Sequence, residues 1–570
     1  MVAKRKASEL SQTVRSCRSY FTTAATFSLA INLLYLSAPL YMLQLYDRVV
    51  SSSSEVTLVM LTIALVLALM ALSGLDLMRA RVLTRASLRL DRLLAGRVMT
   101  AIIERARFAG GARSQPLRDF DNFRQYITGL GIHAVFDLPW APIYIFVIFL
   151  LNPLLGFFAL GSAVLLVSLA LINEWRVRAP LADAGEAATR TYNFTEMSMR
   201  NSEVVQAMGM TEGLLRRWVR DRARMLERQA TASDRAATIT SLIRFFRLSV
   251  QSIILGLGAY LVIEHEATVG SMFAASFLLA RALQPVEQIV SSWRNLLSAR
   301  NAYGRVRDLL ATAPVRETRL EMPRPSGHIA VEGLTHVTAP GTRPLLRNVG
   351  FRIEAGEVLG IIGPSGAGKS TLCRHIVGVL RPSSGTVRID GVELAHYSPL
   401  ALGRDLGYLP QDIELFADTV GANIGRFVFS ESGAIVAAAQ LAGAHEMILR
   451  LPDGYETQVG DGGMALSGGY RQRVGLARAV FGNPSVVVLD EPSSNLDSEG
   501  DAALAECINR LKNSRVTVII VSHRPTSLAV VDKILLLRDG MVEAFGPRAE
   551  VLARLAAPAP HVVASFAGQR

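Results

Sequence analysis

The stretch Glu357-Val-Leu-Gly-Ile-Ile-Gly-Pro-Ser-Gly-Ala-Gly-Lys-Ser-Thr371 decides the fold of the second half of the chain. Its apolar start predicts a strand over 357–362, and residues 372–380 predict a helix after the glycine-rich loop. A strand, a loop of this spacing and a helix form a P-loop, whose backbone N–H groups close on the phosphates of a nucleotide. The whole loop is therefore expected to bind a nucleotide: Gly363, Pro364, Ser365, Gly366, Ala367, Gly368, Lys369, Ser370 and Thr371.

A second polar site ends the apolar stretch Val486-Val-Val-Leu-Asp-Glu491. We expect the ammonium of Lys369 to neutralise the β and γ phosphate oxygens, and the hydroxyl of Ser370 to reach a magnesium ion that Asp490 holds through water. Glu491 then lies where a general base could polarise the attacking water. The alternative is a buried strand that ends in two acids by chance, and the neighbouring P-loop argues against it. The pattern therefore predicts hydrolysis of ATP with Mg²⁺.

The segment Leu466-Ser-Gly-Gly-Tyr-Arg-Gln-Arg473 resembles the LSGGQ signature of the ATP-binding-cassette (ABC) ATPases, and the resemblance extends over the whole cassette. It implies that Gln411, in Leu409-Pro-Gln-Asp412, is the Q-loop glutamine, a catalytic and magnesium-binding residue. By the same resemblance Asp497 belongs to the D-loop, 494–497, and His523, after the predicted strand 516–521, is the switch histidine that senses the γ-phosphate. In isolation, such a histidine is more often a plain surface residue.

The resemblance also implies a homodimer. In the family the signature serine and glycines face the nucleotide held by the other subunit, so Ser467, Gly468 and Gly469 would complete a site in a second copy. Two ATP molecules at this interface would hold the copies together until hydrolysis. Closing and opening would then bias the membrane helices between inward-facing and outward-facing states.

Two positions depart from the family pattern. Tyr470 replaces the glutamine of the signature, and Ala339 stands before Pro340 where the family has an aromatic residue that stacks on adenine. The Tyr470 hydroxyl can still form a hydrogen bond in place of the glutamine amide. We therefore expect ATP turnover that is reduced, but not absent, relative to a Tyr470→Gln variant. Base contacts are expected in part from His336 or from the partner subunit.

The first half of the chain is predicted to lie in a membrane. Half of the 570 residues are hydrophobic, only 19% are charged, and the mean hydropathy is positive. About 20 apolar residues cross the hydrocarbon as a helix. Six segments approach that length: 21–43, 56–75, 132–151, 154–173, 242–263 and 269–293.

The basic residues indicate the orientation of these spans. The net charge of +12 could suggest nucleic acid, but the arginines crowd the long loops after the second and fourth segments, Arg79 among them, without interleaved aromatics. The positive-inside rule therefore places the N-terminus, both long loops and the ATPase in the cytoplasm, and no nucleic-acid partner is expected. The three cysteines, Cys17, Cys373 and Cys507, are expected to be reduced structural thiols because their spacing fits no metal or disulfide pattern.

Helical patterns at 86–108 and 179–199 should continue the spans into the cytosol. Segments near 119–125 and 208–218 would either form bends that press on the ATPase or belong to solvated helical hairpins, and the sequence supports both. Arg281, inside the sixth segment, should face a cavity or the bundle interior, because a charge in lipid is costly. The alternative is that this end of the span emerges into the cytosol.

Three motifs in the membrane half narrow the family further: Ser37-Ala-Pro-Leu-Tyr-Met-Leu-Gln-Leu-Tyr-Asp-Arg48, Phe136-Asp-Leu-Pro-Trp-Ala-Pro142 and Arg281-Ala-Leu-Gln-Pro-Val-Glu-Gln288. They closely resemble the permease/ATPase of type I secretion systems, in the branch that exports alkaline proteases and lipases. The resemblance implies a bacterial inner-membrane homodimer surrounded by lipids, with a periplasmic membrane-fusion adaptor, an outer-membrane channel and unfolded protein substrates that carry a C-terminal signal. Alternatives are an exporter of lipids, peptides or small molecules, and a transport-inactive regulator, against which the intact ATPase residues argue.

The fold class that follows is an all-α six-span ABC exporter transmembrane domain fused to an α/β P-loop nucleotide-binding domain. The expected boundaries are a cytoplasmic N-terminal segment at 1–20, the transmembrane domain at 21–303, a linker at 304–327, the ATPase domain at 328–556 and a tail at 557–570.

Overall fold

The computed structural model describes residues 9–109, 115–313, 322–338, 343–428, 432–463 and 465–556. The chain divides into two compact units, Met1–Pro314 and Val315–Arg570. The division falls inside the expected linker, although residues 304–312 of that linker belong to a helix of the first unit. Each unit is described separately below.

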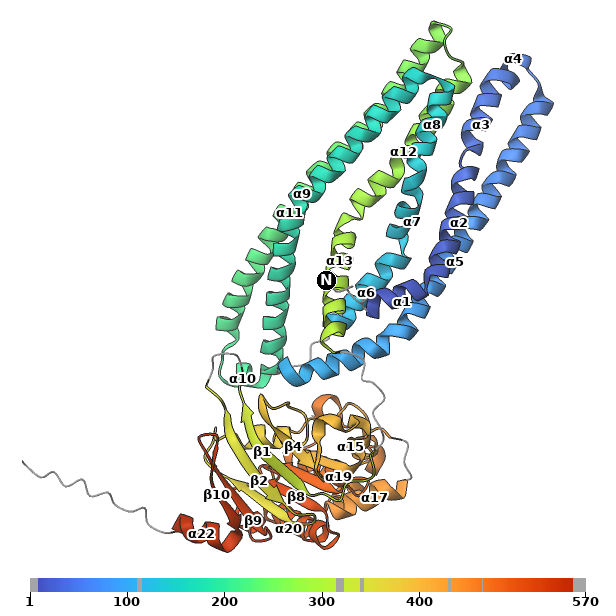
Figure 1. Ribbon diagram of the computed structural model, residues 1–570. Helices are drawn as coiled ribbons and strands as arrows, with labels where there is room; N and C mark the ends of the chain where they lie inside the picture. The colour runs from blue at the N-terminus through green and yellow to red at the C-terminus, as the bar shows by residue number, and fades with distance from the viewer. Residues whose placement is uncertain are drawn as a thin grey trace, which may run out of the picture. The chain divides into compact units, whose positions relative to one another are not determined.

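The described part of the first unit is helical (Figure 1). Its elements are α1 (Glu9–Ser16), α2 (Arg18–Leu34), α3 (Ser37–Gln44), the π-helix η1 (Leu45–Val49), α4 (Val50–Ser52), α5 (Glu55–Ala109), α6 (Gln115–Thr128), α7 (Leu130–Asp137), the 3-10 helix η2 (Leu138–Trp140), α8 (Ala141–Leu151), α9 (Pro153–Arg200), α10 (Ser202–Ala207), α11 (Thr211–Ile263), α12 (Val269–Ser291) and α13 (Trp293–Thr312).

Six helical stretches of this unit are long and apolar enough to cross a membrane, which confirms the six expected spans. They are Arg18–Ser52, Glu55–Arg105, Gln115–Leu151, Pro153–Met199, Thr211–Ile263 and Val269–Ser291. Helices suit this setting because each satisfies its own backbone hydrogen bonds away from water. The helical continuations expected at 86–108 and 179–199 are also confirmed, as parts of α5 and α9.

Local sequence signals set where several of these helices begin. The Asn152 side chain accepts a hydrogen bond from the backbone N–H of Leu154 at 2.9 Å, and Pro153 occupies the first turn of α9. At the start of α12, Thr268 and Ser271 form a reciprocal capping box. Such caps satisfy backbone donors that have no partner inside the helix.

For the segments near 119–125 and 208–218, the sequence left open either a bend or a helical hairpin. Residues 119–125 lie within the continuous helix α6, and residues 110–114 before it lie outside the described part. Of 208–218, the first residues form the turn between α10 and α11, and the rest are helical. In Figure 1, α9 and α11 run side by side along most of their length, and α12 packs against α3, α8 and α11.

The second unit contains two sheets. A four-stranded antiparallel sheet has the order β2-β1-β4-β5, and a six-stranded sheet has the order β10-β9-β3-β8-β7-β6. In the larger sheet the five strands from β9 to β6 are parallel, and β10 pairs antiparallel with β9. The strands are β1 (Ile329–His336), β2 (Leu346–Ile353), β3 (Val358–Ile362), β4 (Ser384–Ile389), β5 (Val392–Glu393), β6 (Leu406–Leu409), β7 (Val486–Asp490), β8 (Thr517–Val521), β9 (Lys533–Arg538) and β10 (Met541–Pro547).

Helices and apolar clusters bury both faces of the parallel sheet. Along β7 the side chains of Val487 and Leu489 join one hydrophobic cluster, whereas Val486 and Val488 join another. The α-helices of this unit are α14 (Lys369–Ile376), α15 (Pro399–Asp405), α16 (Val420–Ile424), α17 (Ser432–Leu441), α18 (His445–Leu449), α19 (Gly468–Val480), α20 (Ser498–Asn513), α21 (Pro525–Leu528) and α22 (Arg548–Ala556). The helix expected over 372–380 is α14, which ends at Ile376, shortly before Gly378 adopts a φ of +72°.

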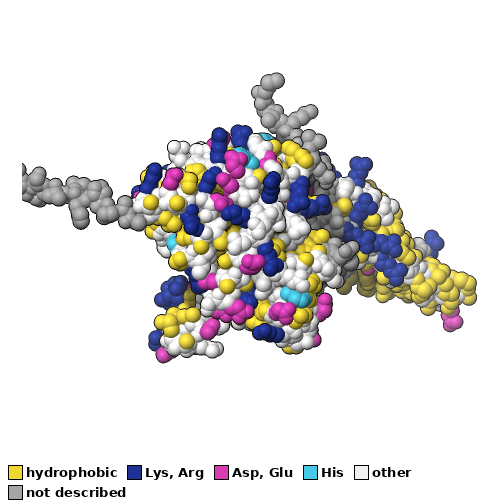
Figure 2. Space-filling model, turned by 90° about the horizontal axis from the view of Figure 1, so that it is seen from below, with side chains coloured by type: hydrophobic (Ala, Val, Ile, Leu, Met, Phe, Trp, Pro, Cys, Tyr) yellow, Lys and Arg dark blue, Asp and Glu magenta, His cyan; other side chains and the backbone are white. Residues whose placement is uncertain are grey.

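The surface chemistry of the chain can be followed in Figure 2. Over the large rounded part of the face shown, Lys and Arg side chains are interspersed with Asp and Glu rather than gathered in one block. The part at the right of the same view carries many hydrophobic side chains together with a group of Lys and Arg side chains. Exposed hydrophobic side chains are what lipid requires of a membrane-spanning helix.

Candidate nucleotide site

The predicted P-loop connects β3 to α14 at the carboxyl end of the parallel strand. Gly363 has a φ of +148°, and a Cβ there would lie 2.1 Å from the carbonyl oxygen of Leu537. Gly368 has a φ of +98°, and a Cβ there would lie 2.7 Å from a methyl group of Leu346. Both positions therefore require glycine, which keeps the loop backbone bare for close approach by a ligand.

Lys369 is the first residue of α14 and is largely buried beneath the loop. Its Nζ atom donates hydrogen bonds to the carbonyl oxygens of Gly363 at 2.8 Å and Pro364 at 3.0 Å. These bonds fold the side chain back against the loop, so its positive charge lies beside the loop backbone. This arrangement gives the loop the electrostatics of a phosphate site.

Asp490 ends β7 with its side chain almost fully buried. The hydroxyl of Ser370 donates a hydrogen bond to its carboxylate at 3.2 Å. Burial raises the pKa of Asp490 above its ordinary value, and the hydrogen bond from Ser370 opposes that shift. A hydroxyl and a carboxylate oxygen converge here, and such oxygen ligands are the ones that Mg²⁺ prefers.

Glu491 follows Asp490 directly and has a φ of +52°, a left-handed conformation that is uncommon outside glycine. Its backbone N–H donates to the carbonyl oxygen of Val521 at 3.1 Å, which holds the residue in that conformation. Strain of this kind persists where the surrounding structure fixes it, and it is concentrated at functional sites.

Gln411 lies two residues beyond β6, and its Nε2 atom donates to the carboxylate of Glu491 at 3.1 Å. The two residues are 80 positions apart in the chain, and they meet because β6 pairs with β7. The sheet thus brings together the predicted Q-loop glutamine and the predicted base.

His523 lies two residues beyond the end of β8 and is exposed. In the parallel pairing of β7 with β8, Asp490 is the partner of Val521. His523 is therefore at the same edge of the sheet as the two acids.

The signature segment begins α19. Ser467 caps this helix, and Gly468 and Gly469 form its first turn next to Asn495. The buried side chain of Gln472 donates to the carbonyl oxygen of Pro492 at 2.6 Å, which ties the helix to the loop after β7. Gln472 was not among the predicted site residues, although a polar side chain on the buried face of a helix is a signal for one.

Asp497 has a local structural contact in addition to its predicted role. Its carboxylate accepts a hydrogen bond from the backbone N–H of Gly500 at 2.8 Å and caps α20. This bond is the main reason that the pKa of Asp497 lies below its ordinary value, and Arg473 lies 3.4 Å from the same carboxylate. The carboxylate is otherwise open to solvent.

His336, the residue predicted to help bind the base, packs edge to face against His375 of α14, with ring centroids 4.8 Å apart. Burial lowers the pKa of both rings, that of His375 to about 4. Both rings are thus neutral at physiological pH. Ala339 and Pro340 lie outside the described residues.

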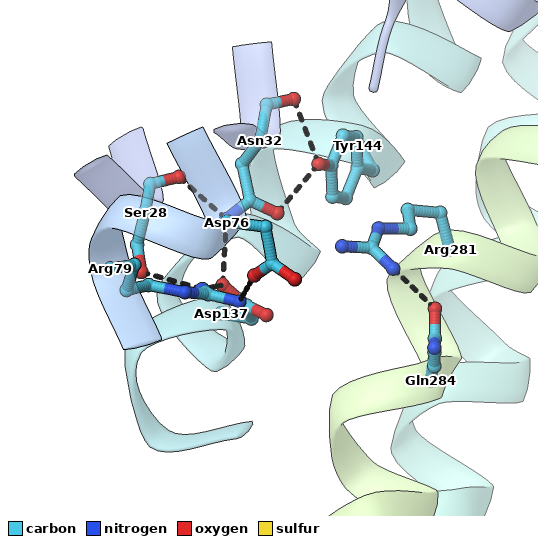
Figure 3. A network of polar contacts seen from close by, with 8 residues as sticks. All are labelled: Ser28, Asn32, Asp76, Arg79, Asp137, Tyr144, Arg281 and Gln284. Carbon is cyan, nitrogen blue, oxygen red and sulfur yellow. Dashed lines mark hydrogen bonds and ion pairs between the residues drawn. The ribbon is translucent and has the colours of Figure 1, made fainter. Parts of the chain in front are cut away.

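Arg79, expected among the arginines of the long polar loop, is instead buried within α5. Its side chain is only 6% exposed, and it donates to Asp137 at 3.2 Å, Asp76 at 2.7 Å and Ser28 at 2.8 Å. The network continues through Asn32, which donates to Asp137, to the hydroxyl of Tyr144 (Figure 3). A polar chain thus joins α2, α5, α7 and α8.

Comparisons with known proteins agree with this architecture. Residues 346–494 match the model for the family described as ABC transporter, and residues 21–286 match the one described as ABC transporter transmembrane region. The chain is 42% identical to the Type I secretion system ATP-binding protein PrsD of Rhizobium meliloti (strain 1021), over 96% of this chain and 94% of that protein.

Two more distant similarities extend this result. The Toxin RTX-I translocation ATP-binding protein of Actinobacillus pleuropneumoniae is 29% identical, over 94% of this chain and 77% of that protein. Among solved structures, a bacterial Atm1-family ABC exporter with ATP bound superposes with a TM-score of 0.78 at 23% identity, over 95% of this chain and 99% of that one. At that identity, the last similarity shows the fold alone.

Proposed function

Since this chain belongs to the ABC transporters, and among them to the type I secretion ATP-binding proteins, we propose that it uses ATP to export unfolded proteins that carry a C-terminal signal. The chain is a multi-pass membrane protein and an ABC-type ATPase. The observation that carries the proposal is the 42% identity to a type I secretion protein, because it runs through 96% of the chain and so includes the membrane spans.

The P-loop and the edge of the sheet support an assignment of roles for ATP hydrolysis. Gly363 to Thr371 would cradle the phosphates, and Lys369 would neutralise them. Ser370 and Asp490, whose oxygens lie 3.2 Å apart, would hold Mg²⁺ together with Gln411. The ion would neutralise charge on the transferred phosphoryl group.

The residues at the ends of β7 and β8 would act on the attacking water. Glu491 would accept its proton, and the hydrogen bond from Gln411 would orient the carboxylate. His523 would contact the γ-phosphate. The left-handed backbone at Glu491 aims this side chain independently of Asp490, so adjacent acids can serve two different purposes.

The site would be completed by a second copy of the chain. Ser467, Gly468, Gly469 and Asp497 would act on the nucleotide held by the other subunit, in a homodimer. Bonds from Gln472 and Arg473 hold the start of α19 against the D-loop region, so these two segments would move together. ATP bound between the copies would then favour the closed dimer by binding it more tightly.

In the cell, the transmembrane domain at 21–303 would span the inner membrane. The segment 1–20, the linker at 304–327, the ATPase at 328–556 and the tail at 557–570 would be cytoplasmic. The partners would be a periplasmic membrane-fusion adaptor, an outer-membrane channel, the unfolded substrate and membrane lipids.

The test is deletion of the gene, followed by analysis of the proteins in the culture medium. The medium should lose one or more secreted proteins, and the unchanged gene should restore them. A gene with Glu491→Gln should not restore them, although its product should be present in the membrane at a normal level and bind ATP. A medium unchanged in its proteins, with lipids or small molecules lost instead, would reject protein export.

A further inference from the structure

The helix α12 has one open face that is mostly polar. Between residues 274 and 291, its flanking side chains are buried, including those of Leu278, Leu279, Ala282, Leu283, Val286 and Val290. Five of the exposed or half-buried positions follow one another at spacings of four and three and are here called the α12 stripe: Phe277, Arg281, Gln284, Gln288 and Ser291. Ala280, Glu287 and Ile289 are also half-buried. Residues at these spacings lie along one side of a helix.

The α12 stripe is too polar for contact with lipid tails. The exposed residues of the second span are apolar, as in Val59, Met60 and Ile63. Four of the five α12 stripe residues are polar or charged. Polar side chains within membrane spans face the bundle interior or a water-filled path.

Arg281 lies deep within the span. It follows Val269, the first residue of α12, by twelve residues, which is about 18 Å of helix rise. The hydrocarbon is about 30 Å thick, so the guanidinium lies within it and not at its edge. This depth argues against the alternative that the residue simply emerges into the cytosol.

The contacts of Arg281 leave its positive charge without a counter-ion. The guanidinium lies over the ring of Tyr35 at 3.3 Å from the centroid and donates to the Oε1 atom of Gln284 (Figure 3). Among the residues that the structure describes, no carboxylate lies within ion-pair distance of it. The nearest acid along α12, Glu287, is paired with Arg247 at 2.9 Å.

The neighbouring polar groups are already occupied. Asp137 binds Arg79 and Asn32, and Tyr144 donates to the oxygen atoms of Asn32. Arg281 reaches from its own helix toward this network, where it interacts with the neutral hydroxyl of Tyr144, and it also donates a hydrogen bond to Gln284 (Figure 3). Arg79, a buried cation with two carboxylates beside it, is the contrast: Arg281 has none.

The rest of the α12 stripe suits an extended polypeptide. The amides of Gln284 and Gln288 each offer donors and an acceptor, as a peptide backbone requires. Pro285 has no N–H, so the helix cannot satisfy the carbonyl oxygen of Arg281 from that position. The ring of Phe277, 46% exposed, adds an apolar contact at one end.

We propose that the α12 stripe lines the path of the exported polypeptide and that Arg281 binds its carboxylates, whether from Asp and Glu side chains or from the C-terminus. This inference rests on the proposed function, because it names the contact that a protein substrate makes in the membrane. The occupant is a polypeptide because a cation without a counter-ion attracts an anion, and the flanking amides match a peptide chain.

The test uses the full-length protein in lipid nanodiscs and measures equilibrium binding of short, unstructured fluorescent peptides. One peptide carries aspartates and an amidated C-terminus, the second carries asparagines and a free C-terminus, and the third carries asparagines and an amidated C-terminus. The unchanged protein should bind each of the first two about 10- to 100-fold more tightly than the third, the value of a charge-assisted hydrogen bond. The comparison of the first two separates side-chain from C-terminal carboxylates.

Three variants test whether Arg281 causes the preference for carboxylates. Arg281→Gln should bind all three peptides equally, and Arg281→Lys should keep most of the preference. Arg281→Glu should instead prefer a peptide whose aspartates are replaced by lysines. The matched control is Arg244→Gln, which removes the same charge from an exposed position on α11 and should leave the preference unchanged.

Two outcomes overturn the inference. The first is a preference for carboxylates that survives in Arg281→Gln; if that variant does not fold, an unchanged preference in Arg281→Glu has the same meaning. The second is equal loss in Arg244→Gln. If the unchanged protein restores export in the gene deletion but either outcome occurs, only this inference fails. If it restores no export, the proposed function fails as well.

Discussion

Replacing Arg79 by methionine should destabilise the membrane unit strongly, because it leaves a buried carboxylate without its counter-ion. The side chain of Asp137 is only 10% exposed and would keep the hydrogen bond from Asn32 but lose its ion pair. Asp76, 52% exposed, would be solvated by water at little cost. The loss in the free energy of unfolding should therefore come mainly from Asp137, the one buried carboxylate left without a counter-ion.

Breaking one partner of a buried ion pair costs about 3–5 kcal/mol. The expected loss in the free energy of unfolding is about 3 kcal/mol, at the lower end, because Asn32 still donates to Asp137. The matched control is Arg190→Met on α9, whose ion pair with Glu186 is 70% and 66% exposed. That exposed pair should contribute less than about 1 kcal/mol.

The assay is unfolding of the purified protein in mixed micelles by titration with SDS, for each variant and for the double variant Arg79→Met with Asp137→Leu. The double variant should be more stable than Arg79→Met alone, because no unpaired charge remains buried. Equal losses for Arg79→Met and Arg190→Met would refute the reasoning. So would a double variant whose loss is the sum of the two single losses.

Four further predictions concern the ATPase unit. Lys369→Ala should weaken ATP binding about 10- to 100-fold, because two or more charge-assisted hydrogen bonds to phosphate are lost, as equilibrium binding of a fluorescent ATP analogue would measure. Tyr470→Gln should raise ATP turnover on the order of fivefold, the value of one hydrogen bond of about 1 kcal/mol. Asp490→Asn should abolish Mg²⁺-dependent hydrolysis yet stabilise the unit thermally. Because burial raises the pKa of Asp490, the carboxyl group stabilises the fold at acid pH, and this stabilisation is lost as the pH rises through the raised pKa. The stability advantage of Asp490→Asn should therefore grow as the pH rises above the ordinary value of 3.8. Cys507, whose pKa burial raises to about 12, should not react with iodoacetamide at pH 8 unless the protein is denatured.

Each of these predictions has a clear contrary result. Unchanged nucleotide affinity in Lys369→Ala would argue against its phosphate role, and equal turnover in Tyr470→Gln would show that the tyrosine is no handicap. An Asp490→Asn variant less stable than the unchanged protein at neutral pH would contradict the stated cost of the buried charge. Rapid native labelling of Cys507 would mean that its helix opens readily.

Much of the fold was readable because the signals are local. The P-loop is contiguous, and its strand, loop and helix are set by residues 357–376 without help from the rest of the chain. The six spans are likewise local, since a helix in lipid needs only its own apolar residues and its own hydrogen bonds. Where the pattern was ambiguous, as at residues 119–125, the sequence left a bend and a helical hairpin open, and the segment is helical.

The candidate site was only partly readable. The apolar strand that ends in two acids pointed to Glu491, and the resemblance to the ABC ATPases pointed to Gln411 and His523. The hydrogen bond between Gln411 and Glu491, however, depends on β6 lying beside β7. Two further hydrogen bonds also depend on the tertiary packing. They are the bond by which Asp497 caps α20 and the bond from Gln472 to Pro492. The order of strands in a sheet depends on how helices and strands far apart in the chain pack together. It therefore cannot be predicted from any one stretch of sequence.

By itself, then, the sequence determined the elements, the six spans and the residues of the phosphate loop, because each of these depends on neighbours along the chain. Only the tertiary structure decided which polar groups meet. It buried Arg79 with Asp137 across helices 58 residues apart in the chain, and it left Arg281 over Tyr35 without a carboxylate. Arg79 and Arg281 therefore lie in different electrostatic environments, the first beside carboxylates and the second without one. The free energy of a charge depends on what surrounds it in space.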